Sequence, residues 1–154
     1  MPGIYFDEMK VGQIFKHPIR RTVTETDNVW FSALTHNPAY LHLDEQYCKE
    51  NTEFGQRIVN SAFTLGLVVG ISVNETTFGT AVANLGWDEV RFPKSLFHGD
   101  TVHVESEIIE LRESKSRPNA GIVTFIHRGF NQHNELICSC KRSGLQLKKP
   151  AGVC

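Results

Sequence analysis

The chain has 154 residues, of which 40% are hydrophobic and 21% are charged, and its formal net charge at pH 7 is -1. This length suits one domain with a substantial core, so we expect residues 1–154 to form a single domain with a flexible tail at 148–154. The small net charge argues against a nucleic-acid or acidic-membrane partner. The longest apolar run, residues 62–73, is interrupted and too short to span a bilayer.

The cysteines and histidines suggest neither disulfides nor a metal. Four cysteines, at positions 48, 138, 140 and 154, follow no disulfide-framework spacing. Cys138 and Cys140 lie two apart in a strand-like run, so both point to one face and cannot bridge normally. No N-terminal segment has the order of a secretory signal, and we expect a reducing, cytoplasmic setting. The His and Cys residues lack zinc-site spacing, so no metal is expected.

The first part of the chain predicts one strand and one short helix. Residues 12–23 read as a strand in which Pro18 indicates an edge or a bulge. Thr24 is a good N-cap, and acidic residues follow in the first turn. An amphipathic helix that ends before Pro38 is predicted by four apolar residues at helical spacing, Val29, Trp30, Ala33 and Leu34.

An irregular polar stretch, residues 36–57, separates this helix from a second one. Loops of this length are usually functional or disordered, and the aromatic residues here favour an ordered loop. The following segment, residues 59–73, is apolar on every face, which is typical of a buried helix. Gly66 and Gly70, four positions apart, would let that helix lie close against another backbone.

The second half of the chain predicts strands at 80–92, 101–111, 121–129 and 136–147. The order of the elements predicts an α+β fold in which an antiparallel sheet wraps around one long buried helix, the hot-dog arrangement. A ferredoxin-like α+β sandwich is the alternative. It requires a second crossover helix among the late strands, and no segment there has the 3.6-residue period of a helix.

The polar stretch carries the residue types of an acid/base site. A histidine side chain exchanges protons near neutral pH, so His42 can take a proton from water. Asn37 cannot take a proton, but its carboxamide can accept a hydrogen bond from water and donate one to a substrate. His36 is a rival base that we expect at the surface. Asp44 is expected to be a capping or surface carboxylate.

Residues 31–67 resemble the hydratase signature of the MaoC-like dehydratases, a branch of the hot-dog proteins that act on acyl thioesters. The family has an Asp five positions before its catalytic His, and this chain has Asn37 five positions before His42. Residues 35–37 resemble the Thr-x-Asn form of a subgroup similar to the mesaconyl-CoA hydratases. Further similarity at Arg112–Val123 extends the resemblance over most of the chain.

This resemblance implies a reversible syn addition of water to a 2-enoyl-CoA, with His42 as the base and Asn37 assisting. A backbone N–H at the start of the long helix, around Ser61 and Ala62, would stabilise the enolate, because unpaired N–H groups there favour negative charge. No organic cofactor or metal is implied, and CoA is the carried group of the substrate.

The same resemblance implies a homodimer or larger homo-oligomer whose sheets join edge to edge. A short acyl group, branched or dicarboxylic, is expected, with Arg57 or Arg117 contacting its carboxylate and Tyr40 contacting the substrate. Two other functions stay open. A hot-dog thioesterase would place an Asp or Glu in or near the central helix, and residues 59–73 contain neither. The other is an acyl-CoA binding module without turnover, which an Asn in place of the Asp would suit.

Overall fold

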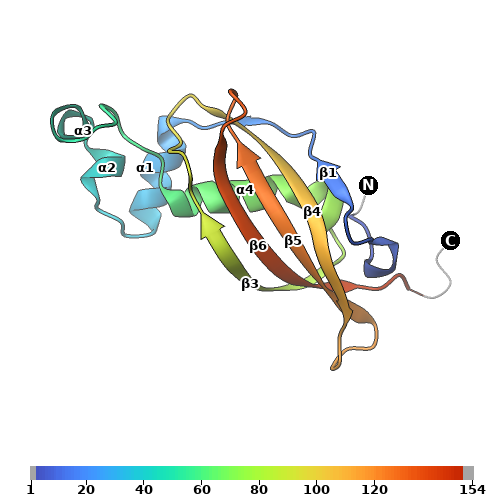
Figure 1. Cartoon of the computed structure of the whole chain (residues 1–154). Coiled ribbons are helices and arrows are strands. Elements are labelled where there is room, and N and C mark those ends of the chain that lie inside the picture. The colour runs from blue at the N-terminus through green and yellow to red at the C-terminus, as the bar shows by residue number, and fades with distance from the viewer. Residues whose placement is uncertain (1–2, 151–154) are drawn as a thin grey trace.

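The computed structural model describes residues 3–150. Figure 1 shows a sheet in front of a long helix, with shorter helices projecting to one side. The elements in chain order are η1 (Phe6–Glu8), β1 (Ile14–Lys16), β2 (Arg21–Thr22), α1 (Glu25–Leu34), α2 (Tyr40–Leu43), α3 (Glu45–Asn51), α4 (Ser61–Thr76), β3 (Ala81–Arg91), β4 (Thr101–Glu113), β5 (Ala120–Phe130) and β6 (Leu136–Leu147).

The sheet is antiparallel, with the strand order β1-β4-β5-β6-β3 and with β2 also paired to β4. Its long strands pass in front of α4, which packs against the inner face of β4, β5 and β6 (Figure 1). The predicted hot-dog fold is therefore confirmed, and the four late strands lie where the sequence predicts them. Alternate residues of β4 are buried, from Val102 to Ile108, as its alternating pattern requires.

The predicted first strand is divided into β1 and β2, since Pro18 falls between them and has no N–H to donate. Just before this break, the N–H of His17 donates to the carbonyl of Val104 at 3.1 Å. The chain thus pairs with the edge of β4 at two places, through β1 and through β2, and the side chain of His17 between them is buried. This division has a structural consequence because His17 belongs to a buried polar chain described below.

The predicted helix is α1, and its capping box is formed by Thr24 and Asp27, each accepting a hydrogen bond from the other's backbone N–H. The expected buried face was wrong. Trp30 is exposed, whereas Asn28 and Ser32, one turn apart, are fully buried. The polar face is turned inward because it makes hydrogen bonds to the segment before α4, which an apolar face would leave unsatisfied.

The polar stretch 36–57 is ordered, and it contains α2 and α3 where no regular structure was predicted. Both helices are shorter than two full turns beyond their caps, so their apolar periodicity is too brief to recognise. Asp44 caps α3 by accepting the N–H of Tyr47 at 2.8 Å, which confirms its expected capping role.

Helix α4 is the predicted central helix, but a single chain buries only one side of it. Val68, Ile71 and Ser72 are buried against the sheet. The opposite side is a row of small or polar residues spaced four apart and exposed to solvent, Ala62, Gly66, Gly70 and Asn74. The prediction of a helix buried all round is therefore corrected for the single chain, since its sheet covers one side alone. Close packing on the covered side requires Gly129, where a Cβ would overlap Cγ2 of Val68.

A chain of hydrogen bonds crosses the interior of the sheet. His17 Nδ1 lies 2.6 Å from Glu75 Oε2 of α4, and His17 Nε2 lies 2.8 Å from Ser106 Oγ. Ser106 Oγ in turn lies 2.7 Å from His127 Nδ1. We call Glu75, His17, Ser106 and His127 the buried relay. Its far end, His127 Nε2, has no partner, which is the expected result if every proton in the relay is donated toward Glu75.

The buried relay predicts a measurable dependence of stability on pH. Burial is the main cause that lowers the pKa of His127 to about 3, and the nearby positive charge of Arg142 contributes to the shift. The unfolded chain takes up this proton near pH 6.5 and the native state does not. The free energy of unfolding therefore falls as pH drops from about 6.5 to 3, by up to about 1.4 kcal/mol per pH unit.

Urea unfolding of the wild type and of His127→Gln at pH 7, 6, 5 and 4 measures this effect. The variant is expected to lose less stability over that range, because the carboxylates that both proteins share contribute equally to each curve. Parallel curves for the two proteins would show that His127 is not the group responsible.

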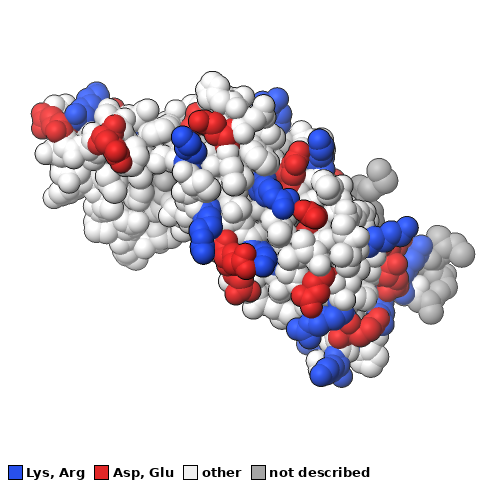
Figure 2. Space-filling view, in the orientation of Figure 1, with Lys and Arg blue, Asp and Glu red and all other residues white. Residues whose placement is uncertain are grey.

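Acidic and basic side chains are interspersed over the outer face of the sheet, with no large area of one sign (Figure 2). The described cysteines, Cys48, Cys138 and Cys140, are free and buried. Burial raises the pKa of Cys138 to about 12 and that of Cys140 to about 11, so both are protonated thiols at neutral pH.

Part of the predicted tail makes contacts. Lys148 Nζ lies 2.6 Å from Glu113, and the N–H of Lys149 donates to Asp7. Residues 151–154 lie outside the described residues. Within residues 3–150, no helix has the length and apolarity needed to cross a membrane. In the same part of the chain, no three His, Cys, Asp or Glu side chains gather in a way that could hold a metal ion.

Candidate active site

His42 lies on α2 with one ring nitrogen fixed by the backbone. Its Nδ1 lies 2.9 Å from the carbonyl oxygen of Ile58, in the segment that leads into α4. A carbonyl only accepts, so this contact places the ring proton on Nδ1 and leaves Nε2 with a free lone pair. His42 is half-buried, which keeps Nε2 accessible while the ring is held. The arrangement suits a general base.

Asn28 of α1 connects the segments around His42 through hydrogen bonds. Its Nδ2 lies 3.3 Å from the carbonyl of His42, 3.1 Å from that of Ile58 and 2.9 Å from His98 Nε2. Its Oδ1 accepts the N–H of Asn60 at 2.8 Å. One fully buried carboxamide therefore joins α1, α2 and the start of α4. The position of the imidazole of His42 depends on this residue, although Asn28 itself is enclosed.

The other two histidines near this region are less suited to act as a base. His98 accepts from Asn28 through Nε2, so that lone pair is occupied. Burial is the main cause that lowers the pKa of His98, and the charge of Arg57 adds to it. His36 is exposed and has a left-handed backbone (φ 55°) at the end of α1, which confirms its expected surface position.

Asn37 is half-buried and shapes the loop before α2. Its Oδ1 accepts the N–H of Ala39 at 3.0 Å, which is the bond of an Asx-turn. Among residues 3–150, no group accepts a hydrogen bond from its Nδ2. In the same part of the chain, no hydrogen bond joins Asn37 to His42.

The start of α4 supplies the backbone donors expected there, with one difference. Asn60 is the N-cap, and its Oδ1 accepts the N–H of Ala62 at 3.0 Å, so this N–H is already used. The N–H of Ser61 has no partner among the described residues. Ser61 lines a small cavity of about 100 Å³ together with Ile58, the residue that anchors His42. The segment that leads into α4 therefore carries both the unpaired N–H of Ser61 and the carbonyl that holds His42.

A larger apolar groove follows α4 away from this end. Its volume is about 450 Å³, and its walls are Ile19 and Arg21 on one side, Phe31 of α1, and a face of α4 from Phe63 to Ile71. Phe31 and Phe63 meet edge to face, with 5.7 Å between ring centroids. The groove has the dimensions and the apolar lining of a small-molecule site.

The three residues predicted to contact the substrate, Arg57, Arg117 and Tyr40, lie in different surroundings in the structure. Arg57 is paired with Glu25 at 2.6 Å and with Glu45 at 3.0 Å, so its charge is already neutralised. Arg117 is exposed in the hairpin between β4 and β5, at the opposite end of the molecule from α2 (Figure 1). Tyr40 is exposed on α2, with its ring against that of Tyr47 at 5.1 Å.

Sequence reasoning missed two residues that position the site, Asn28 and Ile58. Ile58 acts through a carbonyl, which no side-chain motif reports. Asn28 had a recognisable signal, because it and Ser32 lie one turn apart on a helix whose apolar residues are turned outward. A pair of short polar residues at that spacing indicates a polar contact with a neighbouring segment.

Comparison with known proteins identifies the family of the chain. The family model described as "MaoC like domain" matches residues 7–129. A mesaconyl-CoA hydratase from Cereibacter sphaeroides is 31% identical over 91% of this chain, and a β-methylmalyl-CoA dehydratase from Chloroflexus aurantiacus is 29% identical over 88%. The chain spans about two fifths of these relatives, 40% and 38% of their lengths.

Two solved structures show the same fold over nearly the whole chain. A monoamine oxidase regulatory protein from an Archaeoglobus species has a TM-score of 0.85 and 30% identity, covering 97% of this chain and 98% of that one. The unliganded R-hydratase PhaJ1 from Pseudomonas aeruginosa has a TM-score of 0.76 and 26% identity, covering 96% and 88%. The family model matches most of the chain and the solved structures share its fold, so the chain belongs to the MaoC-like domain family.

Proposed function

We propose that the protein is an acyl-CoA hydratase that adds water reversibly, in the syn sense, across the double bond of a 2-enoyl-CoA. The observation that carries the proposal is the state of His42. The carbonyl of Ile58 holds its Nδ1, and no group among residues 3–150 makes a hydrogen bond to its Nε2. Three residues after Ile58, the N–H of Ser61 at the start of α4 has no partner in the same part of the chain. Family membership and the names of the relatives support the same class of reaction.

The proposed reaction uses these groups as follows. Nε2 of His42 takes a proton from water as the water oxygen bonds to the β-carbon of the enoyl thioester. The pair of electrons of the double bond moves toward the thioester, whose oxygen gains negative charge and accepts from the N–H of Ser61. His42 then returns the proton to the α-carbon. Nδ2 of Asn37 is free to hold the water, and no cofactor is required, because the thioester itself acidifies the α-position.

The test is an assay of the purified protein against crotonyl-, mesaconyl- and longer 2-enoyl-CoA esters, with enoyl absorbance and free thiol followed together. Loss of absorbance without thiol release is the result expected of a hydratase. Thiol release would instead indicate a thioesterase, and CoA-ester binding with neither signal would indicate a binding module. Arg57 was expected to contact a carboxylate of the acyl group, but its charge is paired with Glu25 and Glu45. Activity with mesaconyl-CoA therefore tests whether a dicarboxylic acyl group is a substrate.

The Asn37→Asp variant tests the division of roles in the loop. A carboxylate can accept the N–H of Ala39 as the carboxamide does, so the Asx-turn and the fold should persist. A carboxylate can also hold the water, so the hydratase rate is expected to stay within about threefold of the wild type or to rise. A loss as large as that of His42→Ala would show that the carboxamide itself is needed and that the proposed roles are wrong.

We further propose that the apolar groove along α4 takes the acyl chain, since it begins at Phe63, half a turn from Ser61. Tyr40, exposed on α2, is proposed to contact the substrate outside the groove. Replacing Gly66 in the floor of the groove with leucine should lower kcat/KM for long enoyl-CoA esters more than for crotonyl-CoA.

A homodimer joined along β3 is proposed as the working unit. β3 is a long edge strand whose outer edge has no partner among the described residues, and Leu85 and Trp87 are exposed on it. Such an edge normally requires a cover in a soluble assembly. Sedimentation of the wild type should give twice the mass of one chain.

The reducing cytoplasm is the proposed setting, supported by the free, buried thiols.

A further inference from the structure

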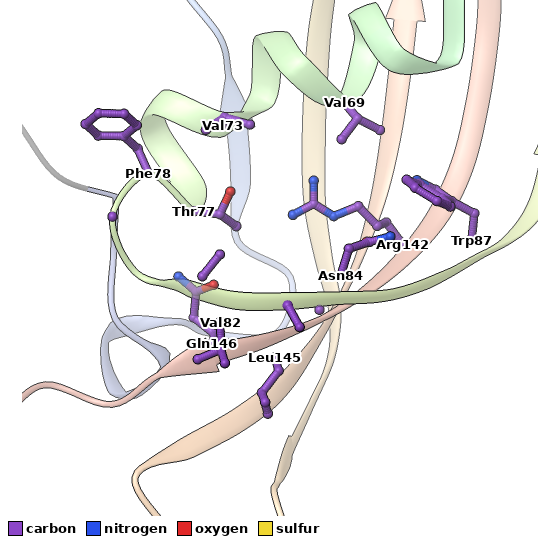
Figure 3. Close-up of a pocket in the computed structure, with 14 residues that line it drawn as sticks. Val69, Val73, Thr77, Phe78, Val82, Asn84, Trp87, Arg142, Leu145 and Gln146 are labelled. Atoms are coloured by element: carbon purple, nitrogen blue, oxygen red, sulfur yellow. The ribbon is translucent and has the colours of Figure 1, made fainter. Parts of the chain in front are cut away.

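A second cavity lies on the other flank of α4, away from the groove and from His42. It has a volume of about 380 Å³ and lies between α4, β3 and β6. Val69 and Val73 of α4 form one wall, and residues of β3 from Ala81 to Trp87 form the other. Figure 3 shows the guanidinium of Arg142, from β6, reaching from the sheet toward α4 between these walls. We call this cavity the Arg142 pocket.

Arg142 is the only ionisable residue that lines the pocket, and it is 94% buried, with a relative exposure of 6%. Among residues 3–150, no hydrogen bond or ion pair satisfies its guanidinium, and its Nε is a buried donor without a partner. Its one specific contact is with the ring of Phe125, 5.8 Å from the guanidinium carbon. Every other described arginine that is half-buried, such as Arg57 or Arg128, has a carboxylate partner.

An unpaired buried charge is costly, and proteins normally pair it. The surroundings give Arg142 no such pairing. Burial lowers its pKa, and no carboxylate opposes that effect. Its neighbour His127 stays neutral, partly because Arg142 is charged. Gln146, also in the wall, is committed to Ile4, Thr76 and Thr80. The charge therefore faces the cavity.

From this geometry we propose that the Arg142 pocket binds a carboxylate at the end of an apolar chain. A carboxylate matches the planar fork of a guanidinium with two parallel hydrogen bonds. The valines of α4, together with Phe78 and Leu145, suit an alkyl chain and would not hold a hydrated phosphate group. Asn84 beside the guanidinium can donate a further bond to the carboxylate (Figure 3).

The carboxylate could belong to a free alkyl acid or to the far end of a dicarboxylic acyl thioester. Val69 follows Ser61 by eight residues, so the pocket begins about 12 Å along α4 from the proposed oxyanion donor. A four-carbon acyl group such as crotonyl is too short to span that distance. The second source depends on the proposed hydratase function, whereas binding of a free acid does not, so the two ideas fail independently.

Trp87 at the rim of the pocket is the reporter for the test. In a Trp30→Phe background it is the only tryptophan of the chain. Octanoate is expected to change its fluorescence saturably, while octanol, which has the same length without the charge, should bind at least tenfold more weakly. Arg142→Met should abolish the preference for octanoate, and Arg142→Lys should weaken it. Arg128→Met, on the outer face of β5, is the matched control and should behave as the parent.

Thermal unfolding of Arg142→Met separates binding from folding. Removal of an uncompensated buried charge should leave its Tm equal to or above that of the parent, and its sedimentation should be unchanged. The proposal is overturned if octanoate does not bind the parent, or if Arg142→Met binds it equally well. It is also overturned if Arg142→Met becomes monomeric, since the guanidinium would then be pairing with a second copy of the chain.

The source of the carboxylate is tested with enoyl-CoA esters of ten to twelve carbons, with and without a terminal carboxylate. If the acyl chain supplies it, Arg142→Met should lower kcat/KM for the carboxylated ester at least tenfold and leave the methyl-ended ester unchanged. If a free acid supplies it, the two esters should respond alike to the substitution. Octanoate binding then supports the pocket in either case.

Discussion

His42→Ala is expected to lower kcat for hydration of a 2-enoyl-CoA by about 10²–10⁴-fold, because it removes the group that takes the proton from water. KM should change much less, since the imidazole contributes to the transition state and hardly to substrate binding. The fold should persist, because the ring makes one hydrogen bond, from Nδ1 to the carbonyl of Ile58. Steady-state kinetics with crotonyl-CoA measure the effect.

The matched control is His36→Ala. His36 is an exposed histidine of the same loop, and its side chain makes no hydrogen bond within residues 3–150, so the kcat of this variant should stay within about twofold of the wild type. His42→Gln is the second control, since glutamine can donate to Ile58 and cannot act as a base at neutral pH. If His42→Gln retained the wild-type rate, the imidazole would be a structural residue and another group would have to be the base.

Asn28→Ala is expected to lower the free energy of unfolding by about 3 kcal/mol, which corresponds to roughly 10 °C in Tm for a chain of this length. The carboxamide is fully buried and has four partners within hydrogen-bond distance. Alanine at this position leaves those four buried partners without the carboxamide that they contact. Activity should also fall at temperatures where the variant is folded, because the carbonyls of His42 and Ile58 lose their common donor.

Ser32→Ala is the control for this prediction. Ser32 lies one turn further along the same buried face of α1 and has a single side-chain partner of this kind, the Nδ2 of Asn60 at 3.3 Å. Its loss should cost about 1 kcal/mol. Chemical unfolding of both variants tests the difference, and an Asn28→Ala variant no less stable than Ser32→Ala would mean that α1 is not fixed by this residue.

The fold was predictable because its strongest signals are long and regular. The strands from β3 to β6 have 11 to 13 residues each, and alternate residues of β4 face the core. Pro18 and Thr24 mark the break in the first strand and the start of α1 through backbone chemistry that one residue controls. The exposed row on α4 was not predictable, because Gly66 and Gly70 satisfy either a buried or an open helix face equally well.

The candidate site was only partly predictable, for a different physical reason. His42 lies on α2 and Ser61 begins α4, but the interactions that orient this region use backbone atoms, the carbonyl of Ile58 and the N–H groups at the start of α4. Such atoms are the same in every residue, so the sequence carries no mark of them. Arg57 shows the opposite limit. An arginine suggests a contact to a substrate carboxylate, but the two glutamates that pair with it come from distant positions in the sequence.

The buried relay also bears on how the molecule assembles. His17 is 58 residues from Glu75 and 89 residues from Ser106, so its contacts close very long loops of chain. The β4–β5 and β5–β6 hairpins close short loops, which are faster to form. During synthesis, the first strand therefore emerges long before its partner β4 exists. The earliest residues to be made are among the last to reach their native positions, and Ser106 and His127 stay without their full set of hydrogen bonds until then.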